Sequence, residues 1–159
     1  MEKLTFLGIG PKIARITIPY LSIAIVLTIL FPQVFTFGKV LRDPMLVAGI
    51  IFLLVAIVCY ILTLRLMIPG LRNNRLITGG MYRLSRNPLY LSLLLFLLPG
   101  VGLVMNSWIV ITASIVGYLL FRRFIHEEDE MLERLFGDDY RKYRERTPGF
   151  LPNPFGNKQ

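Results

Sequence analysis

Two short polar segments in the second half of the sequence contain residue types that can bind a small ligand. Residues 79–90 read GGMYRLSRNPLY, and residues 127–130 are four consecutive acids. Glycines let a ligand approach the backbone closely, and a proline in the first helical turn, as expected for Pro88, leaves free amide groups that attract a carboxylate. The two segments therefore offer donors for an anionic group and acceptors for a cationic one.

Each segment also has a purely structural explanation. A basic loop with a helix cap and two interfacial tyrosines is common beside a membrane, and residues 79–90 fit that description. Four acids at the C-terminal end of a helix oppose its dipole and repel one another, so they need a cation nearby. That cation is either a positively charged ligand, such as a sulfonium or an ammonium, or a set of arginine side chains: Arg83, Arg86, Arg122 and Arg123.

The elements that must position these residues are apolar helices. Hydrophobic residues make up 54% of the 159 residues and gather in unbroken runs, which are apolar on all sides and suited to lipid. Only Asn106 and Ser107 separate the last two runs, which predicts a tight hairpin of two short helices, and Pro19, Pro99 and Gly100 are expected to kink their helices. We predict four membrane-spanning helices, at residues 16–37, 45–67, 89–105 and 108–125.

The basic residues predict the orientation of these helices. The loop between the second and third helices and the tail after the fourth are rich in arginine, whereas the turn at Asn106 has none, so loop and tail are expected on the cytoplasmic side. Lys3, Lys12 and Arg15 place the N-terminus on the same side. A net charge of +8 then matches anionic lipid head groups, and no nucleic-acid partner is expected because the basic residues flank apolar runs.

The residues beyond the fourth run predict a polar C-terminal part. Apolar side chains between positions 131 and 143 fall near one face of a helix that Gly137 interrupts. Such a segment lies in the membrane interface or packs under the bundle. The predicted fold class is therefore all-α, a multi-pass membrane helical bundle with a cytoplasmic or interfacial C-terminal segment. We treat residues 1–159 as one domain with a two-helix membrane part (1–70), a ligand-binding and catalytic part (71–152) and a tail (153–159).

Together with the C-terminal residues, the two polar segments resemble a known superfamily. The residues concerned are Gly80-Met81-Tyr82, Arg86-Asn87-Pro88-Leu89-Tyr90, Glu127-Glu128-Asp129, Leu132, Phe136-Gly137, Tyr140, Tyr143, Arg146-Thr147-Pro148 and Leu151-Pro152. Their order and spacing over residues 76–152 resemble the isoprenylcysteine carboxyl methyltransferases and the phospholipid (phosphatidylethanolamine) N-methyltransferases. The resemblance implies a membrane-embedded enzyme whose cofactor, S-adenosylmethionine, binds at the cytoplasmic face.

The resemblance also implies roles for individual residues. The residues implied to bind the cofactor are Gly80, Tyr82, Arg86, Asn87, Pro88, Tyr90, Glu127 and Glu128. The residues implied to take part in catalysis are Arg146, Glu128 and Asp129. Asn87 stands where the carboxyl methyltransferases usually have histidine and resembles the N-methyltransferases, whereas the long C-terminal segment resembles the carboxyl methyltransferases. The implied acceptor is thus either a carboxylate of the isoprenylcysteine type or a phospholipid amine.

The two acceptors make different chemical demands. A carboxylate needs only to be positioned by a cation such as Arg146, whereas an ammonium group must first lose a proton, a task for Glu128 or Asp129. In both cases the acceptor is a lipid or lipidated molecule that enters from the bilayer. No metal site is expected, because the single histidine, His126, and the single cysteine, Cys59, cannot form one. The alternative function is a membrane transporter or scaffold subunit without catalytic activity.

Overall fold

The structure is a computed structural model that describes residues 8–151. Within this range the chain is helical, and the one β pairing is an isolated bridge between Thr36 and Ser107. The all-α fold class predicted from the sequence is therefore confirmed. The elements are α1 (Gly10–Leu30), α2 (Pro32–Phe35), α3 (Arg42–Arg72), the 3₁₀ turn η1 (Gly80–Arg83), α4 (Pro88–Leu91), the π-helical η2 (Ser92–Leu97), α5 (Leu98–Val104), α6 (Trp108–Phe136) and α7 (Asp138–Arg146).

Three helices in the described part of the chain, α1, α3 and α6, are long and apolar enough to cross a membrane. A shorter apolar helix, Pro88–Val104, combines α4, η2 and α5. The bundle exposes many large apolar side chains, among them Val26, Val58 and Leu119, which a protein in water would bury. The protein is thus an integral membrane protein, as its apolar runs predicted.

The bounds of the first helix differ from the prediction, and prolines explain the difference. The helix begins at Gly10 because Pro11 occupies its first turn, where the missing amide is not needed. It ends at Leu30 because Phe31 precedes Pro32 and adopts φ −130° and ψ 58°, outside the helical region. Farther along, the irregularity expected at Pro99 takes the form of the π-helical η2 directly before α5.

The prediction of a short last helix is wrong. The helix α6 continues from Trp108 through the four acids to Phe136, where Gly137 ends it with a φ of +54°. The acids at positions 127–130 therefore lie inside a helix and not at its end. Hydrogen-bonded partners for these acids, described below, reduce the repulsion that suggested an end there.

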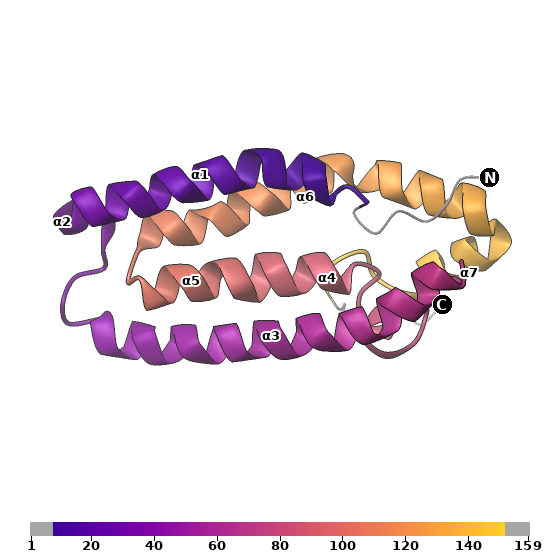
Figure 1. The fold of residues 1–159 in the computed structure, drawn as a ribbon, viewed down its shortest axis with the longest axis horizontal. Helices are drawn as coiled ribbons and strands as arrows, with labels where there is room; N and C mark the ends of the chain where they lie inside the picture. Colours follow the sequence, from indigo (N-terminus) through magenta and orange to yellow (C-terminus); the bar gives the residue numbers. More distant parts are fainter. Residues whose placement is uncertain (1–7, 152–159) are drawn as a thin grey trace.

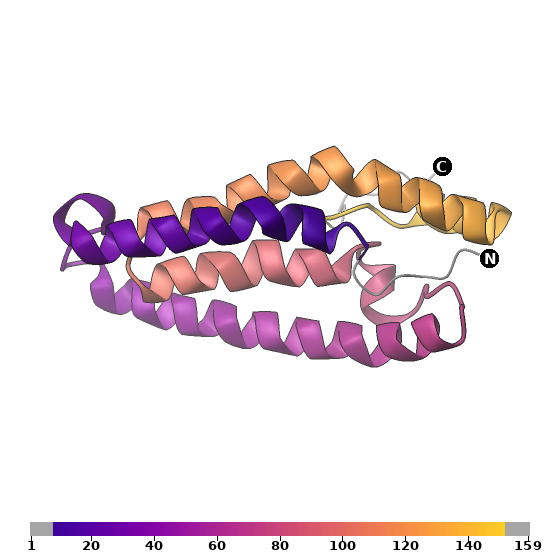
Figure 2. The ribbon, with the colours of Figure 1, turned by 45° about the horizontal axis from the view of Figure 1, so that its top comes forward.

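The long helices lie side by side in two pairs (Figure 1). One pair is α1 with α6, and the other is α3 with the helix formed by α4, η2 and α5. The turn at Asn106 joins α5 to α6 and lets these two helices contact each other. The end of α6, the helix α7 and the loop after α3 gather at one end of the bundle (Figures 1 and 2), which we call the polar end.

The elements α4, η2 and α5 form one continuous helix. Close contact between α5 and α3 therefore fixes the position of α4 in the bundle. A Cβ atom at Gly49 would lie 2.7 Å from the Val104 nitrogen and 3.0 Å from the Gly100 oxygen. Both are backbone atoms, which cannot turn aside as a flexible side chain can. Glycine at this position of α3 therefore allows the two helix backbones to approach closely.

We predict that Gly49→Ala lowers the midpoint of thermal unfolding in detergent. Overpacking at a tight contact costs about 1–3 kcal/mol, which outweighs the roughly 1 kcal/mol that alanine gains over glycine as a helix former. The matched control is Gly79→Ala, because Gly79 has an extended backbone and open space around its Cβ position. Equal midpoints for the two variants would contradict the close approach of α3 and α5.

Candidate functional site

A buried ion pair joins the start of α4 to α6 at the polar end. Arg86 Nη1 donates to Asp129 Oδ1 at 2.8 Å, and the two side chains are only 12% and 7% exposed. The Tyr140 hydroxyl of α7 donates to the same Asp129 oxygen and accepts a hydrogen bond from Arg86 Nη1 at 3.0 Å. Three elements that are distant in the sequence are thus held together by one neutralised, hydrogen-bonded cluster.

The residues that follow α7 fold back against the start of α4. The Arg86 amide donates to the Pro148 carbonyl at 2.9 Å, and Asn87 Nδ2 donates to the Gly149 carbonyl at 2.7 Å. The Asn87 amide donates to Ser85 Oγ at 3.1 Å. The Asn87 side chain therefore anchors the C-terminal segment beneath the helix that Pro88 begins.

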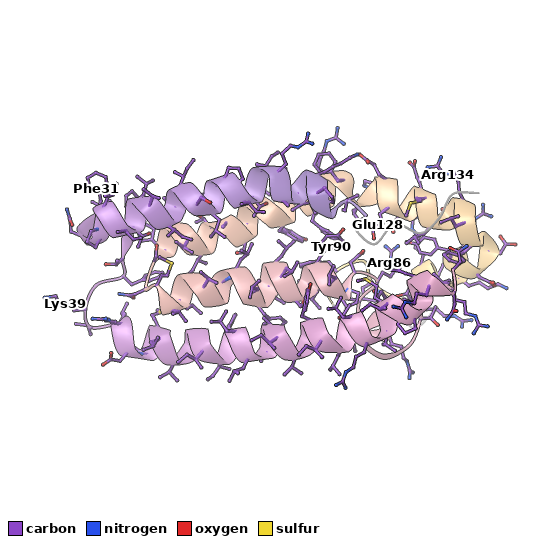
Figure 3. All side chains as sticks on the ribbon, in the orientation of Figure 1. Phe31, Lys39, Arg86, Tyr90, Glu128 and Arg134 are labelled. Carbon is purple, nitrogen blue, oxygen red and sulfur yellow. The ribbon has the colours of Figure 1, made fainter. Side chains whose placement is uncertain are left out.

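Glu128 precedes Asp129 but has different neighbours. Its Oε2 accepts hydrogen bonds from the Tyr90 hydroxyl at 3.3 Å and from the Ile9 amide at 3.4 Å. Figure 3 shows Arg86, Tyr90 and Glu128 close together at the polar end of the bundle. Glu128 lies beyond the apolar part of α6, and burial raises the pKa of its carboxyl group; the hydrogen bonds from Ile9 and Tyr90 partly offset that rise, and the negative Asp129 adds to it.

The acids of the run thus differ in how they are neutralised. Asp129 is paired with Arg86, and Glu127 forms an exposed ion pair with Lys12 of α1. Glu130 is exposed on the outside of α6. Among residues 8–151, no basic side chain forms a salt bridge with Glu128. Arginine pairing, one of the two explanations left open by the sequence, therefore holds for Asp129 but not for Glu128.

A cavity of about 100 Å³ lies between Glu128 and the start of α4. Burial raises the pKa of the Tyr82 hydroxyl to about 12, with a contribution from the negative Glu128, so this group on the cavity wall stays protonated at neutral pH. The sequence-predicted site residues on this wall are Tyr82, Arg86, Asn87, Pro88, Tyr90 and Glu128.

The other predicted site residues lie elsewhere. Gly80 lies against Leu66 of α3, and Asp129 lies behind Arg86, where it holds the guanidinium group. Glu127 faces Lys12 at the surface. Arg146 is exposed and lines a second, larger cavity, which does not include Glu128. The structure therefore does not bring Arg146 to Glu128, and its catalytic role stays a prediction.

Several lining residues carry no assigned role from the sequence. Gly8 and Met67 come from the N-terminal part, which was expected only to span the membrane, and Tyr140 and Tyr143 come from α7. The contact of Ile9 with Glu128 is made by a backbone amide, so the identity of the side chain gives no signal for it. The tyrosines were visible as members of an apolar helix face, and only the tertiary fold shows that this face closes the cavity.

One buried atom of a residue that lines the cavity is unsatisfied. Arg86 Nε has no hydrogen-bond partner within the described part of the chain, although Nη1 of the same side chain is fully used. A buried N–H group of a positive side chain without an acceptor is costly and suits the carboxylate of a ligand. Glu128 offers the complementary site for a cation. The donor set therefore fits a small molecule that carries both charges.

Fold and site together define a helical membrane protein with a small polar cavity at one end of its bundle. Residues 67–139 match the family model described as phospholipid methyltransferase. The protein-S-isoprenylcysteine O-methyltransferase of Schizosaccharomyces pombe is 30% identical over 81 residues, which are 51% of this chain and 34% of that protein. Protein-S-isoprenylcysteine O-methyltransferase B of Arabidopsis thaliana is 28% identical over 80 residues, or 50% of this chain and 41% of that protein.

A third relative is not named as a methyltransferase. The cobalt-zinc-cadmium resistance protein CzcN of Cupriavidus metallidurans is 38% identical over 88 residues, which are 55% of this chain and 40% of that protein. No solved structure matches the chain. The matched region thus spans well under half of each relative. The match over residues 67–139 and the two isoprenylcysteine methyltransferases support the superfamily of membrane methyltransferases that the sequence resemblance implied.

We predict that Asp129→Asn strongly destabilises the protein, because it leaves the Arg86 charge buried without a partner, at a cost of about 3–5 kcal/mol. Glu130→Gln removes the same charge one residue away at an exposed position and should change stability by less than about 0.5 kcal/mol. Thermal unfolding midpoints in detergent compare the two variants. Similar midpoints would show that the ion pair contributes little.

Proposed function

We propose that this chain is an S-adenosylmethionine-dependent membrane methyltransferase that modifies a lipid or lipidated acceptor. The observation that carries the proposal is that two residues lining one cavity offer complementary polar groups, a carboxylate and a guanidinium N–H that has no acceptor in the described chain. These are the Glu128 carboxylate, which has no basic partner in the described chain, and the buried Arg86 Nε. The similarity of residues 67–139 to the phospholipid methyltransferase family model, and of about half the chain to an isoprenylcysteine O-methyltransferase, supports the same proposal.

Different residues of the cavity can bind different parts of the donor. S-adenosylmethionine supplies a methyl group on a positively charged sulfur and carries a carboxylate and an ammonium group. Arg86 Nε can donate to the carboxylate, and Glu128 can neutralise a positive group. The rings of Tyr82 and Tyr90 line the same cavity and can face a cation or a flat base.

The cavity must widen before such a molecule can enter. Its volume of about 100 Å³ is smaller than the roughly 300–1,000 Å³ of most small-molecule sites. One wall is formed by residues 75–77, which adopt no regular secondary structure, and another by Gly8, just before α1. We infer that donor binding moves these irregular walls and leaves the helices in place.

Glu128 is also the residue best placed to take a proton. Its raised pKa makes it a stronger base than an ordinary carboxylate, and a phospholipid amine must lose a proton before it accepts a methyl group. A carboxylate acceptor would need no base, and a cation such as Arg146 would only position it. Both acceptor classes therefore remain within the proposal, and a transfer assay distinguishes them.

An apolar groove supports a lipid acceptor. It lies within the bundle, has a volume of about 460 Å³, and is lined by Gly10 of α1, by Ala56, Ile57 and Tyr60 of α3, and by residues between Leu89 and Leu97. Leu89 and Tyr90 line this groove as well as the polar cavity. An alkyl or prenyl chain in the groove would therefore place its head group next to Glu128. The polar end would then face the cytoplasm, in keeping with its arginines.

We predict that the purified protein binds labelled S-adenosylmethionine in equilibrium dialysis and that Glu128→Gln weakens binding about tenfold or more, because a charge-assisted contact worth about 1.5–3 kcal/mol is lost. The charge-matched control, Glu130→Gln, should change affinity less than about twofold. The same labelled donor, offered with native phospholipids or prenylated thiols, identifies the acceptor. If the unmodified protein does not bind the donor, the proposed function is wrong.

We predict that Ile57→Trp, which narrows the apolar groove, raises the KM for the lipid acceptor about tenfold, as expected when apolar contacts worth roughly 1–2 kcal/mol are lost. Donor affinity should not change. The control is Ile51→Trp, on a lipid-facing part of the same helix outside the groove. Steady-state kinetics with the acceptor found above tests this, and equal KM values for both variants would exclude the groove as the acceptor site.

A further inference from the structure

A second cavity at the polar end has a different chemical character from the first. It has a volume of about 680 Å³ and lies between α7 and the segment from Leu76 to Arg83. Three basic side chains line it, whereas a single acid does, so its walls carry an excess of positive charge. The basic residues are Arg83, Lys142 and Arg146, and the acid is Asp139.

The basic residues of α7 divide into two groups by helix face. Arg141 and Arg144 lie on one side and pair with Glu133 of α6, at 2.6 Å and 3.5 Å. Lys142 and Arg146, four residues apart, lie on the cavity side with Tyr143. Within residues 8–151, neither Lys142, Arg146 nor Arg83 forms an ion pair. On α7, the basic side chains without an ion-pair partner in the described chain are thus the ones that line the cavity.

The depth of the cavity indicates where its ligand comes from. The helix α3 has 31 residues and is therefore about 46 Å long, longer than the roughly 30 Å hydrocarbon layer and close to the full thickness of a bilayer with its head groups. Leu76, which lines the cavity, lies four residues beyond the end of α3. Its basic side chains therefore lie at the level of the lipid head groups.

We propose that this cavity binds a phosphate group, and that the phosphate belongs to the head group of an anionic lipid. Lysine and arginine side chains without protein partners are typical ligands of phosphate oxygens, and anionic lipids supply phosphate at this depth. Thr147 lines the same cavity and can add a hydroxyl donor. The inference does not rest on methyl transfer, because Arg83, Lys142 and Arg146 line this cavity and not the one at Glu128.

The test measures binding of dioctanoyl phosphatidic acid to the full chain in an uncharged detergent, with dioctanoyl phosphatidylcholine and glycerol 3-phosphate as comparison ligands. We predict that phosphatidic acid binds most tightly and that the double variant Arg83→Gln/Lys142→Gln weakens it about 30-fold, as expected for the loss of two cations near a membrane surface. Arg146 is left unchanged, because the family resemblance gives it a catalytic role.

The matched control is Arg141→Gln/Arg144→Gln, which removes the same charge from the paired face of α7 and should change affinity less than about threefold. Equal weakening by both double variants would mean general attraction to a basic surface and would overturn the proposal. Equal affinity for glycerol 3-phosphate and phosphatidic acid would overturn the assignment to a lipid. S-adenosylmethionine binding by the Arg83/Lys142 variant, measured in parallel, separates this result from failure of the proposed function.

Discussion

The arrangement of the polar end depends on the buried contact between Arg86 and Asp129. Neither buried charge is stable without the other. The start of α4, which carries Arg86, and α6, which carries Asp129, must therefore pack together. The Tyr140 hydroxyl, which contacts both groups, adds α7 to the same cluster. The contact also sets the register of α4 against α6: Tyr90 follows Arg86 by four residues, and Glu128 directly precedes Asp129, so the Arg86–Asp129 pair brings Tyr90 to Glu128.

The acidic run shows how one helix can provide a carboxylate that stabilises the fold and another that can act on a ligand. Successive residues of a helix point about 100° apart, so neighbouring acids meet different surroundings. Glu127 reaches Lys12 at the surface and Asp129 reaches Arg86 in the interior, whereas the hydrogen-bond donors that reach Glu128 within residues 8–151 are neutral. Burial of Glu128 destabilises its ionised form, and the raised pKa of its carboxyl group expresses that penalty. Such a penalty is typical of groups that act on a ligand, because a positive ligand removes it.

The sequence was sufficient to predict the helical membrane fold, because segments that are apolar on every side have to face lipid. It was not sufficient for the end of α6. A run of four acids destabilises an isolated helix, and here Arg86 and Lys12, from distant parts of the chain, neutralise two of them. The family resemblance placed Arg86, Asn87, Tyr90 and Glu128 in one predicted site, and all four line one cavity. Arg146 could not be placed in the same way, because the face of α7 that turns inward is decided by the packing of Tyr140 and Tyr143.

The polar cavity keeps two polar groups in a low dielectric without full compensation. Arg86 Nε has no acceptor and Glu128 has no cation in the described chain, and burial of such groups costs free energy. A ligand with opposite charges would compensate both groups, but its entry needs walls that can move. The walls differ in the free energy that their movement would cost. Moving the wall that contains Arg86 would break its buried ion pair with Asp129. The loop at residues 75–78, by contrast, has no regular structure and is held by one backbone hydrogen bond, from the Arg75 amide to the Gly70 carbonyl. A site that opens at this loop keeps its charged groups in register while the ligand enters.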